Sequence, residues 1–357
     1  MGDAIRAVVL GTGQMGSGIA RLILQKPALH LVGACARRAE REGVDLGLAV
    51  GLDRKIGVAI TTDLSRLLER TQPQIAIQAT CSKLEDAWHE LTTLIEHRIN
   101  VISIAEEMAY PAATSPTTAA QLHQLAVKHG VSVLGTGVNP GFVLDLLIIT
   151  LTGVCAEVDS ITARRVNDLS PYGPTVLADQ GVGLTPEAFE KGLRDGSVVG
   201  HIGFEQSLHM IAGALGWELD RIEQKRKPII SRVERQTPFV KVEPRQVAGC
   251  LHTATAYRQG RAVIYLSHPQ QIHPQLEGIE TGDSIQIKGT PDLTIEGRPE
   301  IPGGRATEAL AVNMIPQVVR AEAGLYCMAD LPVPAAMLGD AAYRPFARHN
   351  LSRGCHD

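Results

Sequence analysis

Three glycines near the N-terminus have the spacing of a dinucleotide-binding turn. In the pattern Gly11-x-Gly13-x-x-Gly16, the first glycine permits a tight turn, the second lets the backbone approach a pyrophosphate, and the third allows close packing of helix on strand. The pattern follows an expected strand, Arg6 to Leu10, and opens an expected helix, Gln14 to Gln25, whose N-terminus would face the phosphate charge. We therefore assign a nicotinamide dinucleotide to the residues of this turn: Gly11, Thr12, Gly13, Gln14, Met15 and Gly16.

The end of the second expected strand, Leu29 to Cys35, indicates which dinucleotide binds. A site for NAD carries an acidic residue about 20 residues after the turn, which binds the ribose 2′-hydroxyl. Here the strand is followed by Ala36, Arg37 and Arg38. Two guanidinium groups can bind a 2′-phosphate, which a carboxylate would repel. We predict NADP in preference to NAD, with both arginines as ligands. The alternative is that they are a solvated surface pair.

Polar residues also follow later strands, and ligands of an open parallel sheet gather at the carboxyl ends of its strands. Glu106 and Glu107 come after the expected strand Asn100 to Ile104. Adjacent carboxylates beside a cofactor could hold a cationic substrate and act as a base. The alternative is an acidic pair at a helix N-terminus. Thr80, Asn139 and Pro140 also follow expected strands, and we assign them to the cofactor. Asn139 is a candidate ligand of the substrate as well.

A second set of polar residues lies in the later part of the chain. Asn167 and Asp168 follow an expected strand, and His201 and Glu205 flank a glycine turn. We interpret these four residues, together with Phe142, as candidate substrate ligands. Each could instead make an ordinary hydrogen bond within a loop.

Two other kinds of chemistry receive little support from the sequence. A metal site could be formed by His268 and His273, with Cys250 and His252 as further candidate ligands. The spacing of these residues is loose, however, and no C-x-x-C or His-Glu-x-x-His element accompanies them. We expect no metal. A Gly-x-Ser-x-Gly elbow is also missing from the sequence, so hydrolase chemistry is not indicated.

Composition excludes further classes of protein. The 357 residues are 44% hydrophobic, which is enough to bury a core, and the length suggests two domains. Aromatic residues make up 4% and the net charge is −4, so we expect no nucleic-acid partner. The six cysteines are scattered, as in a reduced cytoplasmic protein. No apolar stretch is long enough for a membrane span, and we expect no membrane partner.

The elements that must position these residues change along the chain. In residues 1–140, short β-branched runs alternate with helical patterns, which predicts a dinucleotide-binding domain on a doubly wound parallel sheet. Longer strands in residues 141–305 predict an α+β domain on a largely antiparallel sheet. Residues 306–340 predict a helix that returns to the first domain, and 341–357 a polar tail. Expected elements of the later part include helices at Phe142–Leu151 and Ala306–Ala321 and a strand at Pro228–Arg235.

Several long, irregular segments closely resemble the 2,4-diaminopentanoate dehydrogenase family: Val101–Pro111, Gly135–Asp145, Arg165–Pro174, Gly200–Gln206, His268–Pro274, Ala311–Pro316 and Asp330–Pro334. The resemblance runs from the first strand to about Asp340. It implies oxidative deamination of the 4-amino group of 2,4-diaminopentanoate, a step of bacterial ornithine breakdown that yields 2-amino-4-oxopentanoate, ammonia and reduced cofactor. It also implies a fold related to dihydrodipicolinate reductase and a homodimer formed through the second sheet.

The resemblance also suggests roles for the site residues. Related amine dehydrogenases use a glutamate base at this kind of position, so we expect Glu106, or else Glu107, to act as the base. Asp168 and Glu205 are candidates for the substrate ammonium, while Asn167, His201 or an arginine would meet its carboxylate. Two alternatives stay open: a relative that acts on 3,5-diaminohexanoate or on simple amines and ketones, and a non-enzymatic NADP-binding sensor. A sensor would not need the polar segments after Asn139.

Overall fold

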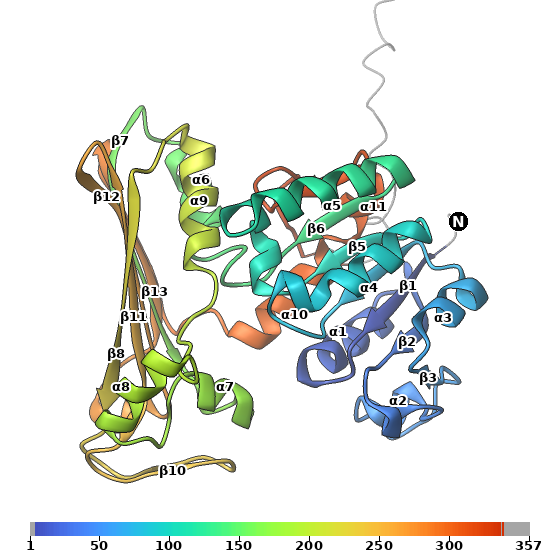
Figure 1. Cartoon of the computed structure of the whole chain (residues 1–357), viewed down its shortest axis with the longest axis horizontal. Helices are drawn as coiled ribbons and strands as arrows, with labels where there is room; N and C mark the ends of the chain where they lie inside the picture. The colour runs from blue at the N-terminus through green and yellow to red at the C-terminus, as the bar shows by residue number, and fades with distance from the viewer. Residues whose placement is uncertain (1–3, 337, 339–357) are drawn as a thin grey trace, which may run out of the picture.

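The first sheet contains seven parallel strands whose order reverses near the middle of the sheet. The computed structural model describes residues 4–336 and 338 (Figure 1). The carboxyl ends of the strands share one edge, and open sheets of this kind bind ligands at that edge, beside the reversal. In spatial order the strands are β15 (Gly324–Tyr326), β6 (Ser132–Gly135), β5 (Asn100–Ser103), β4 (Ile75–Gln78), β1 (Ile5–Leu10), β2 (Leu29–Cys35) and β3 (Ile60–Thr61).

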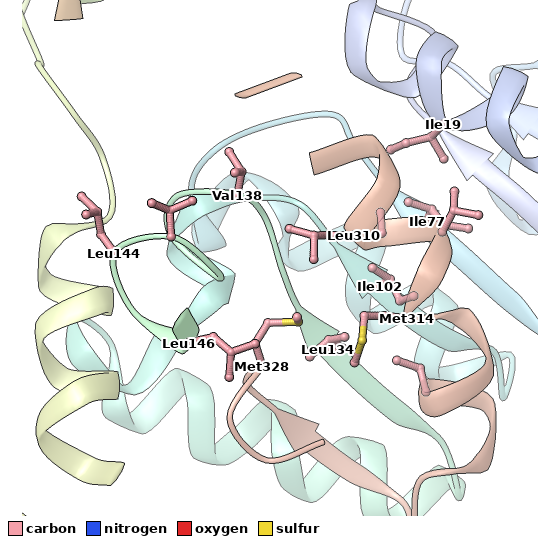
Figure 2. Packing of buried hydrophobic residues seen from close by; sticks show 14 of the residues in the cluster. Ile19, Ile77, Ile102, Leu134, Val138, Leu144, Leu146, Leu310, Met314 and Met328 are labelled. Atoms are coloured by element: carbon pink, nitrogen blue, oxygen red, sulfur yellow. The ribbon is translucent and has the colours of Figure 1, made fainter. Parts of the chain in front are cut away.

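Helices cover both faces of this sheet. One face carries α1 (Gln14–Leu24), α10 (Gly303–Asn313) and α11 (Ile315–Arg320), and the other carries α3 (Leu64–Thr71), α4 (Leu84–Glu96) and α5 (Pro116–His129). Leu310 and Met314, from the C-terminal part of the chain, pack toward Ile102 and Leu134 of the sheet (Figure 2). Burial of these apolar side chains fixes the C-terminal helices on the first domain.

The second sheet has six strands and is mostly antiparallel. In spatial order they are β14 (Leu293–Gly297), β13 (Gly282–Thr290), β7 (Glu157–Asp168), β12 (Arg261–Gln271), β11 (Val247–Arg258) and β8 (Arg221–Ile230). The pair β7 and β12 is parallel. Helices on the side that faces the first domain are α6 (Leu146–Thr152), α7 (Pro174–Asp179), α8 (Pro186–Asp195) and α9 (Phe204–Leu215) (Figure 1). Among the described residues, no helix covers the other side of this sheet (Figure 1).

This architecture confirms the predicted fold class, including the return of the C-terminal helix to the first sheet. The predicted tail, residues 341–357, lies outside the described residues. In the described ranges, no helix has the length and apolar character that a membrane crossing requires. The remaining elements are short: η1 (Ala39–Arg41), α2 (Leu46–Ala49), η2 (Glu106–Ala109), η3 (Pro111–Ala113), β9 (Arg235–Gln236), β10 (Lys241–Val242) and η4 (Pro274–Glu277).

Two predicted elements have different bounds in the structure. The helix expected at Ala306–Ala321 is two helices that meet at Met314, because Pro316 lies in the first turn of α11 and cannot donate a backbone hydrogen bond. The strand expected at Pro228–Arg235 is interrupted: its first residues are the end of β8, which stops at Ile230, and Arg235 begins β9. The buried guanidinium of Arg235 donates to Ser231 Oγ and to the Ile272 carbonyl, and these bonds hold residues 231–234 as a loop between the two strands.

The buried helix expected at Phe142–Leu151 begins only at Leu146, because Asp145 organises the residues before it. The Asp145 carboxylate is fully buried and accepts from Gly141 N at 2.7 Å, Leu146 N at 2.6 Å and Ser207 Oγ at 2.9 Å. A buried carboxylate is tolerated where several donors satisfy its oxygens. Asp145 therefore ties the loop after β6 to the first turn of α9.

Candidate active site

Close backbone contacts shape the glycine turn between β1 and α1. A Cβ on Gly11, whose φ is +95°, would lie 2.4 Å from the Ala79 carbonyl oxygen, and a Cβ on Gly16 would lie 1.9 Å from that of Gly11. A Cβ on Gly13 would meet no other atom within 4 Å, and α1 begins there without a side-chain cap. Open space in front of uncapped N–H groups fits the pyrophosphate of a dinucleotide.

The two arginines after β2 have different surroundings. Arg37 Nε lies 2.7 Å from Glu90 Oε1 on α4, whereas Arg38 is well exposed and its Nε lies 3.9 Å from Glu40 Oε1. Thr80, at the end of β4, donates its hydroxyl hydrogen to the same Glu90 carboxylate. Arg38 is therefore the less restrained of the two predicted phosphate ligands.

A cavity of about 270 Å³ lies between the carboxyl ends of β5 and β6 and the second sheet. It shares Asn167, Tyr172 and Gly303 with a larger cleft of about 1090 Å³ that extends beside α1 and α10. The shared residues show that the cleft and the cavity adjoin. The predicted site residues that line the cavity are Gln14, Met15, Glu106, Asn139, Pro140, Asn167 and His201.

The adjacent carboxylates of η2 point to different places. Glu107 Oε2 accepts from Leu84 N at 2.8 Å, which satisfies a free N–H group at the start of α4. Glu106 lines the cavity and is hydrogen-bonded to the Ser82 hydroxyl. Burial raises the pKa of the Glu106 carboxyl, and the negative charge of Asp179 adds to the increase. Glu106 thus has the surroundings of a proton acceptor, while Glu107 has those of a helix cap.

A chain of hydrogen bonds crosses from the second sheet to the end of β6. The carbonyl oxygen of Asn167 can only accept, so His268 Nε2, at 2.9 Å, carries the hydrogen. His268 Nδ1 is then an acceptor for Asn139 Nδ2 at 3.2 Å. This arrangement leaves Asn139 Oδ1 buried in the cavity wall without a protein partner. It is free to accept a hydrogen bond from a bound molecule.

Two more buried histidines lie close to His268, as the ring contacts with His201 and then from His201 to His252 show. Burial, with the positive charges of Arg165 and Arg226, lowers the pKa of His201 to about 3, and burial lowers that of His252 to about 2. The pKa of His268 is also well below its usual value, mainly because of burial. His201 lines the cavity, and its Nε2 has no partner among the described residues. All three imidazoles are therefore neutral at pH 7.

Three predicted substrate ligands lie apart from this cavity. The Asp168 carboxylate lies at the cleft, where it accepts from Ser170 N at 2.8 Å and His273 N at 3.0 Å. Glu205 Oε1 accepts from the Gln224 side chain at 2.7 Å, and Phe142 packs on the main core. None of these three side chains lines the cavity.

Sequence reasoning missed several residues of the cavity wall. Arg165 is buried, and its guanidinium binds Asp283 at 2.7 Å and the Ile301 carbonyl at 2.6 Å. The sequence does contain a signal for Arg165. Residues two apart on a strand share a face, and Arg165 lies two residues before the predicted ligand Asn167. No local signal marks the others, which come from separate segments: Tyr172, Asp179, Gln180, Gln270 and Thr307.

The histidine run considered for a metal has other partners. His268 belongs to the Asn167–Asn139 chain, and His273 Nε2 is bonded to the Gln236 carbonyl at 2.8 Å. Across the residues that the structure describes, no group of three or more His, Cys, Asp or Glu side chains is arranged to hold a metal ion.

Two known families match different parts of this chain. The sequence profile of the 2,4-diaminopentanoate dehydrogenase C-terminal domain matches residues 142–345, and that of the dihydrodipicolinate reductase N-terminus matches residues 5–103. A 2,4-diaminopentanoate dehydrogenase from Acetoanaerobium sticklandii is 40% identical over 354 residues, which cover 95% of this chain and 96% of that protein. The chain belongs to the 2,4-diaminopentanoate dehydrogenase family. The predicted family is confirmed, and with it an oxidoreductase of the amine dehydrogenase kind.

Solved structures agree with this assignment. The amine dehydrogenase from Mycobacterium smegmatis superposes with a TM-score of 0.84 at 29% identity, covering 94% of this chain and 98% of that one. A dihydrodipicolinate reductase from Paenisporosarcina sp. TG-14 has a TM-score of 0.52 at 12% identity and covers 92% of this chain and 99% of its own. The second likeness shows a shared fold alone. The dinucleotide-binding fold, and hence an NAD(P)-dependent dehydrogenase, is established by these relations.

The buried histidines predict a pH-dependent stability. Their pKa values are lowered in the folded state, so below about pH 6.5 the unfolded chain binds protons that the folded chain does not. The free energy of unfolding should fall as pH decreases, with each histidine contributing about 1.4 kcal/mol per pH unit. Urea titrations between pH 7 and pH 5 measure this slope. His252→Gln retains an acceptor and should reduce the slope by one histidine's share; an unchanged slope would contradict the assignment.

Proposed function

We propose that this chain catalyses NADP-linked oxidative deamination of 2,4-diaminopentanoate at its 4-amino group. The observation that carries the proposal is the Glu106 carboxyl, which lines the cavity beside the glycine turn and has a raised pKa. The balanced reaction consumes the diamino acid, NADP⁺ and water, and produces 2-amino-4-oxopentanoate, ammonium, NADPH and a proton. Membership of the family supports this choice of substrate.

The base follows from the order of events at the reacting carbon. A hydride leaves the carbon that bears nitrogen only when that nitrogen is a neutral amine, so an ammonium substrate must first lose a proton. Glu106 accepts this proton in the proposal and releases it to solvent, which regenerates the carboxylate. The carboxylate then takes a proton from the water that adds to the iminium carbon and passes it to the amino nitrogen. The resulting carbinolamine then expels ammonia. A raised carboxyl pKa suits proton transfer near neutral pH.

The substrate also carries an amino-acid group, which requires a site of mixed charge. Asn139 Oδ1 has an unused acceptor position that suits the second ammonium, and the nearby Asp179 supplies negative charge. Asn167, His201 and Arg165 would meet the carboxylate from the other side, since all three line the cavity. Asp168 and Glu205 are less suited to the ammonium, because protein donors already occupy their oxygens.

The cofactor would be bound at the carboxyl edge of the first sheet, with its pyrophosphate before α1. When bound, the dinucleotide would supply the hydride acceptor, and Gln14 and Met15 would hold it in the cavity that Glu106 also lines. NADP preference is supported by the exposed Arg38 and by the lack of an acid directly after β2. A kcat/KM for NAD equal to that for NADP would refute the preference.

A second copy of the chain would cover the open side of the second sheet. That side exposes 40% of Tyr265, and Leu251, Thr253 and Thr255 are partly exposed along β11. A broad sheet face without a helical cover is suited to pairing through two-fold symmetry. We expect sedimentation equilibrium to give the mass of a dimer, and Tyr265→Asp to shift it toward that of the monomer. A monomeric parent protein would refute this pairing.

The roles of the adjacent glutamates can be separated by substitution. Glu106→Gln should lower kcat by about a hundredfold or more, because it removes a general base, while the Kd for NADP stays within twofold. Glu107→Gln should retain turnover and lower the melting temperature, since it weakens the cap on α4. Stopped-flow kinetics, dinucleotide titration and thermal melting curves measure these effects. Full turnover in Glu106→Gln, or a loss confined to Glu107→Gln, would reverse the assignment.

The amino-acid subsite can be tested with two substrates. Asn167→Ala should raise KM for the diamino acid about tenfold or more, because it removes a polar ligand and releases His268. KM for an amine of the same length without the amino-acid group should stay nearly constant. Steady-state kinetics with both substrates give the comparison. Equal increases in the two KM values would mean that Asn167 acts only on the general shape of the cavity.

A further inference from the structure

Glu90, a residue of α4, lies beside the place where the adenosine ribose would bind. Its side chain is 13% exposed, and its carboxylate accepts from Arg37 Nε at 2.7 Å, from Gln78 Nε2 at 3.2 Å and from the Thr80 hydroxyl. These donors come from the ends of β2 and β4, the two strands that flank β1. Glu90 therefore stands next to the glycine turn, although it lies on a different helix from the turn.

Arg37 is held by α4 on two sides of its guanidinium group. Besides the bond to Glu90, its Nη2 donates to the Asp86 carbonyl at 2.8 Å. About half of the side chain, 49%, stays exposed, so the group is tethered without being buried. Arg38 has one distant acidic neighbour, Glu40, and 62% of its side chain is exposed. The two arginines are equal in sequence but unequal in their freedom to turn toward a phosphate.

We infer that Glu90 determines cofactor specificity by holding Arg37 away from the ribose 2′-position. In the parent protein the 2′-phosphate is then bound by Arg38, and the negative charge of Glu90 limits how strongly NADP is preferred. This inference rests on the proposed binding of a nicotinamide dinucleotide at the glycine turn.

Glu90→Gln removes the charge and retains an amide oxygen for Thr80 and Gln78. The released Arg37 gains the freedom to form a charge-assisted hydrogen bond with a 2′-phosphate, which corresponds to about tenfold in affinity. Calorimetric titration with 2′,5′-ADP and with 5′-AMP, at one ionic strength, measures this directly. The ratio of the two Kd values should shift about tenfold toward 2′,5′-ADP in the variant, while the Kd for 5′-AMP stays within threefold.

A double-mutant cycle separates release of Arg37 from a general change of charge. The gain from Glu90→Gln should vanish when Arg37→Ala is present. Arg38→Ala alone should abolish the parent's preference for 2′,5′-ADP, and Arg37→Ala alone should leave it nearly unchanged. The matched control is Glu85→Gln, which removes the same charge from the same helix at a side chain that is 76% exposed. It should alter the ratio by less than twofold.

Three results would overturn the inference. They are a gain that persists in the Arg37→Ala background, a gain equal to that of Glu85→Gln, and a parent preference that Arg37→Ala removes as fully as Arg38→Ala. The comparison of Arg37→Ala with Arg38→Ala needs no substitution at Glu90. It therefore tests whether Arg37 is held away from the 2′-phosphate even if Glu90→Gln does not fold. Both probes lack nicotinamide and amine groups. A protein without turnover would therefore refute the proposed function, whereas a cycle without coupling would refute the role of Glu90.

Discussion

The neutral imidazole of His268 is the constraint on which the arrangement of the cavity depends. It donates to Asn167 on the second sheet and accepts from Asn139 at the end of the first, so one ring joins the two domains. A protonated ring would present a second N–H to the Asn139 amide hydrogens, and the chain would break. Burial keeps the ring neutral by lowering its pKa, and that burial depends on the close fit of the two sheets around it.

The loop between β6 and α6 holds the two domains together around His268. Asp145 binds Gly141 N and Ser207 Oγ, so the loop that carries Asn139 and the helix that follows His201 share one buried carboxylate. Close contact supports the same join, because a Cβ on Gly203 would lie 2.4 Å from Pro140 Cδ. Both walls of the cavity are thus fixed to each other by the Asp145 carboxylate and by the contact of Gly203 with Pro140. A site built on such fixed elements can hold reacting groups in place without reorganisation.

Adjacent residues of one type take different roles in two places. Glu107 caps α4 while Glu106 lines the cavity, and Arg37 is tethered to Glu90 while Arg38 is solvated. In each pair, one side chain is satisfied by a contact with α4: Glu107 with its N-terminus and Arg37 with Glu90. The other side chain is left for a bound molecule. Helix α4 therefore influences both ends of the cofactor cleft, although its own residues supply no part of the glycine turn.

Local sequence determined the elements whose signals lie within a few residues. The glycine turn follows from Gly11 and Gly16, which the chain geometry requires, and from Gly13, which leaves open space before α1. Helix α3 follows from Asp63, whose side chain caps its first turn. The family was also recognisable from irregular segments that no common fold pattern explains. The alternation of strands and helices gave the first domain for the same local reason.

Tertiary structure alone decided which polar side chains meet. The end of β8 depends on Arg235, whose partner Ile272 is 37 residues away, and the cavity depends on the bond between Asn139 and His268, 129 residues apart. Sequence could name Glu106 and Glu107 but not distinguish them, because the difference is a backbone N–H at Leu84, 23 residues from Glu107. Burial, pKa and partner choice are properties of packed neighbours, and the order of residues along a chain does not contain them until the chain folds.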